Sequence, residues 1–166
     1  MRKIIGVLMG AAMLVGVAGP ASAATNNQQF EIVVRFNGND TASCRVIATG
    51  PIQGVGTCTT TDVSNNVTDV HLILPGGTVD LRARQFGGTD SFNQQACVDT
   101  FTFKENFRVT GGTGAFAGVT GSGVDIGRGV FTAARTAHGC DPNQGRGSVL
   151  VTVTGHISLR GGSAAA

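Results

Sequence analysis

Hydrophobic and polar side chains alternate with a period of two residues along much of this chain. Near the start, apolar side chains occupy every second position, at Phe30, Ile32, Val34 and Phe36. Near the end, one face carries Val149, Val151, Val153, Ile157 and Leu159, and the other carries Ser148, Thr152, Thr154, His156, Ser158 and Arg160. Such alternation predicts β-strands with one buried face, because successive side chains of a strand point to opposite sides of the sheet.

Turn residues divide the chain into eight or nine such segments. We expect strands at 30–36, 43–48, 52–60, 67–74, 78–84, 97–109, through Val124 and Ile126, at 129–137 and at 148–160. Polar connections are expected at 37–40, 61–66, 85–95 and 138–147. No segment has a convincing helical period. The sequence therefore predicts an all-β fold, a closed antiparallel barrel of about eight strands, with a β-sandwich as the alternative.

The first residues have the pattern of a secretory signal peptide. Arg2 and Lys3 precede an apolar run, residues 4–19, and Ala21-Ser22-Ala23 forms a small-residue cleavage site. We expect residues 1–23 to be removed by cleavage between Ala23 and Ala24, leaving residues 24–166 as one domain. A retained anchor is the alternative, but the run is shorter than the ~20 residues that a spanning helix needs. The predicted location is therefore extracellular or the cell envelope, with no stable membrane span.

Four cysteines lie in the predicted mature part, which favours two disulfides in an oxidising compartment. Three pairings are open. Cys44 and Cys58 are equally distant from Pro51 in a predicted hairpin turn, so they would face each other. We therefore expect Cys44 to pair with Cys58 and Cys97 with Cys140.

Charge excludes one class of function. The precursor has twelve Lys and Arg residues against ten Asp and Glu residues, and losing Arg2 and Lys3 leaves ten of each. The basic residues are scattered along the chain, so the cluster expected of a nucleic-acid-binding protein is absent from the sequence.

A glycine-rich segment, residues 107–123, allows two interpretations. Gly112-Thr-Gly114-Ala-Phe-Ala117 satisfies a dinucleotide-binding fingerprint, but that motif needs a helix directly after it. Here glycines and β-branched residues follow, and each glycine costs ~1 kcal/mol in a helix interior. We therefore interpret the segment as a tight hairpin and expect no cofactor. Its hairpin glycines are Gly111, Gly112, Gly114 and Gly118.

The same segment resembles the V-x-G-G-T-G-x-F-x-G-A-x-G hairpin of the allene oxide cyclase and dirigent barrel superfamily. Leu74-Pro-Gly-Gly-Thr-Val79 is similar to an upstream strand-opening segment of that group, and the resemblance covers roughly residues 50–159. It implies an eight-stranded antiparallel barrel, a homodimer or homotrimer, and a cavity for hydrophobic substrates without a metal or organic cofactor. Plant members guide phenoxy-radical coupling or cyclise a fatty-acid epoxide. This chain has no Tyr or Trp, and no family catalytic residue can be carried over to it.

Candidate chemistry is sparse. Asp99 shares strand parity with Cys97, Phe101 and Phe103, so a carboxylate beside aromatic walls could act as a general acid or base. A hydrogen-bonded carboxylate at a barrel mouth is the alternative. We expect Phe101 and Phe103 to line a ligand cavity.

The other polar groups do not indicate a catalytic site. Asp80, Arg82 and Arg84 are expected on a solvated outer face, opposite Val79, Leu81 and Ala83. The three histidines are too scattered for a metal site, so we predict no metal.

Three hypotheses of function follow. The protein binds a small hydrophobic ligand in its lumen, is a cofactor-free isomerase or cyclase, or is an extracellular scaffold without catalysis. No residue set identifies a reaction.

Overall fold

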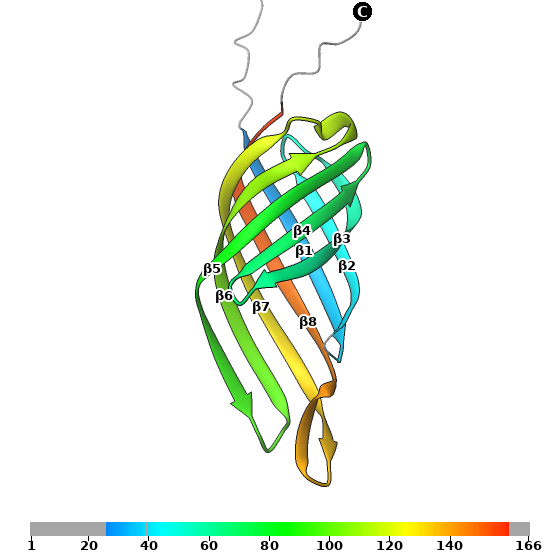
Figure 1. The fold of residues 1–166 in the computed structure, drawn as a ribbon, viewed down its shortest axis with the longest axis vertical. Helices are drawn as coiled ribbons and strands as arrows, with labels where there is room; N and C mark the ends of the chain where they lie inside the picture. Colours follow the sequence, from blue (N-terminus) through cyan, green and yellow to red (C-terminus); the bar gives the residue numbers. More distant parts are fainter. Residues whose placement is uncertain (1–25, 39, 160–166) are drawn as a thin grey trace, which may run out of the picture.

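The computed structural model describes residues 26–38 and 40–159, and the predicted signal peptide with its Ala23–Ala24 cleavage site lies outside them. Eight antiparallel strands form a closed barrel in which each strand pairs with its neighbours in the sequence (Figure 1). Strand β1 also pairs with β8, from Asn27 opposite His156 to Asn37 opposite Arg146. This pairing closes the sheet, so the predicted barrel is confirmed and the β-sandwich alternative is wrong. The strands are β1 (Asn27–Asn37), β2 (Asp40–Thr49), β3 (Gly54–Ser64), β4 (Val67–Leu74), β5 (Gly77–Asn93), β6 (Val98–Gly112), β7 (Thr120–Thr136) and β8 (Gly139–Ser158).

The core lies inside the barrel and follows the predicted alternation. On β1, Phe30, Ile32 and Val34 are buried, and on β5 Val79, Leu81 and Ala83 are buried while Arg82 faces outward. On the outer face Arg82 donates two hydrogen bonds to Asp69, and His71 contacts Asp80. The predicted solvated face of Asp80, Arg82 and Arg84 therefore has the expected orientation.

One end of the barrel is closed by loop side chains together with Gln28 of β1. The amide of Gln28, a buried residue, accepts a hydrogen bond from the Ile52 N–H at 2.8 Å and donates to the carbonyls of Ile52 and Thr49. Ile52 is fully buried, and Phe116 and Val119 pack into the same core cluster. We call this the closed end; it is drawn at the top of Figure 1.

The glycine-rich segment is a hairpin connection, as predicted. One turn of 3₁₀-helix, η1 (Gly114–Phe116), links β6 to β7, and within the described residues the next element after Ala117 is strand β7. Gly114 and Gly118 have φ angles of 59° and 74°, which favour glycine. Gly112 lies against Phe116 and Val119, while Gly111 lies beside the Asp80 carboxylate.

The two segments that carry the family resemblance dock against each other at the closed end. The Ala115 N–H donates to the Gly76 carbonyl at 2.8 Å, and the Thr113 N–H donates to the Thr78 carbonyl at 3.0 Å. A Cβ atom on Gly77 would overlap the backbone of Thr113. These glycines therefore allow two turns to approach closely.

Strand lengths make the opposite end of the barrel uneven. Strands β1 to β4 have 8 to 11 residues, whereas β5 to β8 have 15 to 20. The hairpins β5–β6 and β7–β8 therefore extend beyond the barrel at the end drawn at the bottom of Figure 1. We call this the open end.

Several predicted loops are strand instead. Residues 85–93 belong to β5, and the predicted loop 138–147 lies almost wholly in β8. The predicted loop 61–66 is strand as far as Ser64, and the two predicted strands around residues 124–137 are one continuous β7. Residues 85–93 pair with β6, and residues 139–141 and 146–147 pair with β7, in the protruding hairpins, whereas residues 61–64 pair with β4. A hairpin exposed on both faces needs no apolar alternation, which is why the sequence pattern missed it.

Both predicted disulfides are present. Cys44 and Cys58 join β2 to β3 inside the barrel, and Cys97 and Cys140 join the two protruding hairpins. Two disulfides are consistent with an extracellular protein. Among the described residues, no helix has the length and apolar character needed to cross a membrane.

Candidate functional site

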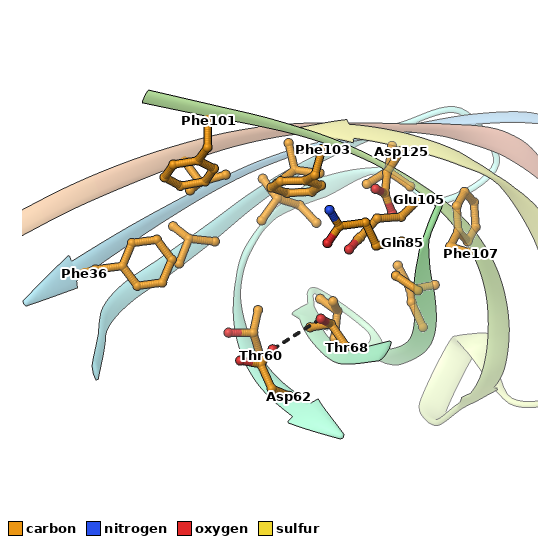
Figure 2. A pocket seen from close by; sticks show the side chains of 18 residues that line it. Phe36, Thr60, Asp62, Thr68, Gln85, Phe101, Phe103, Glu105, Phe107 and Asp125 are labelled. Atoms are coloured by element: carbon orange, nitrogen blue, oxygen red, sulfur yellow. Dashed lines mark hydrogen bonds between the residues drawn. The ribbon is translucent and has the colours of Figure 1, made fainter. Parts of the chain in front are cut away.

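The inner face of β6 brings three aromatic rings and one carboxyl group to the barrel lumen. Phe101, Phe103, Glu105 and Phe107 alternate with outward-facing residues and line one cavity of about 500 Å³ (Figure 2). The predicted ligand-binding residues Phe101 and Phe103 therefore both lie at the cavity. Whether they contact a ligand stays a prediction.

The adjacent strand β7 makes room for these rings because its inner face is mostly glycine. A Cβ atom on Gly127 would overlap the Phe103 ring, and one on Gly129 would overlap the Phe101 ring. Gly123 lies under Phe107 in the same way. The rings therefore lie against bare backbone, which positions them and keeps the centre of the lumen free.

The remaining walls are mainly aliphatic and come from β1, β4, β5 and β8. They comprise Ile32, Val34, Phe36, Val70, Leu81, Ala83, Val149, Val151 and Val153. The cavity volume is within the ~300–1,000 Å³ range of small-molecule sites. Asp62 and Gln85 also line it and are exposed, so the cavity reaches solvent at the open end.

Two carboxyl groups meet in this cavity. Glu105 and Asp125 are directly paired across β6 and β7, and their side chains are hydrogen-bonded to each other. Asp125 is only 4% exposed. No donor in the described part of the chain reaches its Oδ1 atom.

A proton must lie between these two groups, since two ionised carboxylates are both acceptors and repel each other. Burial, together with the charge of Glu105 and the hydrogen bond to it, raises the pKa of Asp125 to about 8. Burial also raises the pKa of Glu105. With the pKa of Asp125 at about 8, the two carboxyl groups share a proton at neutral pH.

The rim of the cavity is polar. The Thr68 hydroxyl donates to Asp62 at 3.3 Å, and this pair faces Gln85 and Glu105 from the short β3–β4 side (Figure 2). A second hollow around the β3–β4 turn shares four residues with the cavity: Asp62, Thr68, Gln85 and Glu105. Glu105 is thus reached from both sides, whereas Asp125 lies deeper.

Asp99, the candidate from the sequence, lies elsewhere. It faces Phe92 and Phe131 across the protruding strands and is not among the residues that line the cavity. Its Oδ1 atom is buried without a hydrogen-bond donor in the described residues. A catalytic role for Asp99 stays a prediction, but the carboxyl groups that line the cavity are those of Asp62, Glu105 and Asp125.

Sequence reasoning missed Asp125 because the apolar neighbours Val124 and Ile126 appeared to be its strand's buried face. They are 38% and 47% exposed instead. The sequence contains a second alternation along the same strand. Every second position is occupied by Gly121, Gly123, Asp125, Gly127 and Gly129. Glycines at that spacing, beside a strand with phenylalanines at the same spacing, indicate an inner face.

Searches for similar proteins found no family model, curated protein or solved structure that matches this chain. Within the described residues, no group of three or more His, Cys, Asp or Glu side chains is arranged to hold a metal ion.

Proposed function

We propose that this protein binds a small hydrophobic ligand in its barrel lumen. The supporting observation is the cavity of about 500 Å³, whose walls are four phenylalanine rings and aliphatic side chains. The interior of an eight-stranded barrel is narrow enough for side chains to fill it. Here glycines replace them along β7, so the space at the open end is a built feature.

A matched pair of substitutions on β8 tests this proposal. Val151 lines the cavity, and its neighbour Leu150 is 42% exposed on the outer face. We expect Val151→Trp to weaken binding of the uncharged fluorophore N-phenyl-1-naphthylamine at least tenfold, because the indole occupies the lumen. Leu150→Trp should bind it like the wild type. Equal binding by both variants, or none by the wild type, contradicts the proposal and favours a scaffold.

A second candidate is a cofactor-free isomerase or cyclase, favoured by the Glu105–Asp125 pair. A buried acid and base sharing one proton, with a pKa near 8, suit proton transfer to and from a bound substrate. The family resemblance implies the same class of reaction. A fatty-acid substrate fits poorly, since its carboxylate would meet a lining whose ionisable groups are all acidic.

The proton-transfer candidate is testable without the natural substrate. 5-Nitrobenzisoxazole opens its ring when a base removes its carbon-bound proton, so it reports on a carboxylate base in an apolar cavity. We expect wild-type protein to accelerate ring opening, with a rate that rises with pH through about 8. Glu105→Gln combined with Asp125→Asn should remove the acceleration, and Asp99→Asn should not. Loss of activity in Asp99→Asn alone would return the role to Asp99.

A further inference from the structure

We propose that the lumen accepts an organic cation, a ligand with an apolar body and an ammonium or amidinium group that binds Glu105 and Asp125. This inference rests on the proposed function and names its ligand class.

The first argument is the sign of charge in the lumen. Of the residues that line the cavity, three are ionisable, and all three are acidic: Asp62, Glu105 and Asp125. The basic residues of β5 and β6, and Arg128 of β7, occupy the alternate positions and face outward: Arg82, Arg84, Lys104, Arg108 and Arg128. The cavity therefore attracts cations and repels anions.

The second argument is an unmet hydrogen-bonding need. Asp125 is buried, and its Oδ1 atom has no donor among the described residues. Glu105, which is paired with Asp125, offers hydrogen-bond acceptors and carries no positive charge. An ammonium group supplies several donors and a positive charge, so it would satisfy both carboxyl groups at once.

The third argument concerns the rest of the ligand. The rings of Phe103 and Phe107, both on β6, lie on either side of the carboxyl pair. Aromatic faces attract ammonium and guanidinium groups, and an apolar body is needed to fill the adjoining walls. A bare metal ion would leave those walls empty, and the described residues offer it no cluster of three ligands.

Binding of such a cation should release a proton. The groups that face the pair are Asp62 on β3, Thr68 on β4 and Gln85 on β5, with aliphatic side chains on β1 and β8. None of them is basic. An incoming ammonium group therefore replaces the shared proton, and its affinity should rise as the pH rises through about 8.

Three probes of matched shape test the inference by calorimetry between pH 6.5 and 8.5. They are 1-naphthylmethylamine, which stays mainly protonated over this range, uncharged 1-naphthylmethanol, and anionic 1-naphthoate. We expect the amine to bind at least tenfold more tightly than the alcohol at pH 8.5, with the naphthoate weakest. The amine's affinity should rise with pH, and proton release should appear as a binding heat that depends on the buffer's ionisation heat.

Two variants connect this behaviour to the carboxyl pair. Asp125→Asn should remove the rise with pH, because it mimics the protonated side chain. Glu105→Gln with Asp125→Asn should abolish the preference for the amine over the alcohol. Glu31→Gln, on the outer face of β1, is the matched control and should leave the preference unchanged.

The outcomes separate the two proposals. If the alcohol binds and the amine binds no better, lumen binding stands and the organic-cation inference is wrong. If none of the three probes binds, both are overturned. Should the double variant fail to fold, the pH dependence and proton release of the wild type decide the question.

Discussion

The two ends of this barrel are built from the same alternating strands but have opposite interiors. At the closed end, Phe30, Ile52 and Ile157 are fully buried, and the Gln28 amide bonds a loop that covers them. Beside the cavity at the open end, the inner positions of β7 from Gly123 to Gly129 are glycines and Asp125, so the lumen stays unfilled. The contrast indicates that the closed end stabilises the fold and that the open end is available for a ligand.

A pair of phenylalanine truncations gives the largest expected effect. Phe30→Ala should destabilise the protein by about 3–5 kcal/mol, because it leaves a cavity in a well-packed core. Phe103→Ala should cost about 1–2 kcal/mol, since one side of its ring already faces an open cavity. Urea denaturation measures both free energies of unfolding. Equal losses would show that the open end is as important for stability as the closed end.

The carboxyl pair gives the next effect, which depends on pH. In the folded state the pKa of Asp125 is raised to about 8 from a usual value of 3.8. Between these values the folded state binds more protons than the unfolded state, so stability should fall as the pH rises. The stabilising effect of protonation is fully present below about pH 4 and is lost as the pH passes through about 8.

Asp125→Asn should remove this dependence. The variant keeps the size of the side chain but carries no titrating group. Its free energy of unfolding relative to wild type should therefore rise by roughly 2–4 kcal/mol as the pH increases from 5 to 8.5. Glu31→Gln, on the exterior, should follow the wild-type curve. Thermal denaturation over this pH range measures the effect. If stability changes with pH in the same way in wild type and Asp125→Asn, Asp125 is not the group with the raised pKa.

The sequence was sufficient to predict the features that depend on a pattern of buried side chains. Alternation on β1 and β8, the turn at Gly50-Pro51 and the cysteine spacing predicted strands, barrel and both disulfides. The sequence was insufficient to predict strands at residues 85–93 and 139–147, because the protruding hairpins carry no apolar face. Half of the main cavity groups were predicted: parity placed Phe101 and Phe103 in the lining, whereas Glu105 and Asp125 were not predicted. Their meeting depends on the cross-strand register of β6 and β7, which no single strand contains.

The smallest expected effect tests whether the glycines of β7 hold the site open. A methyl group on Gly127 would overlap the Phe103 ring, whereas a methyl group on Gly87 would meet no atom within 4 Å. Gly127→Ala should therefore cost about 1–3 kcal/mol, because the ring must tilt toward the lumen. Gly87→Ala should change stability by less than about 0.5 kcal/mol.

Probe binding then distinguishes packing from site formation. If the tilted ring narrows the cavity, Gly127→Ala should also weaken N-phenyl-1-naphthylamine binding several-fold, and Gly87→Ala should not. A Gly127→Ala variant that loses stability but binds normally would mean that the glycine only accommodates Phe103. Loss of both would mean that bare backbone on β7 is what separates an open lumen from a filled one.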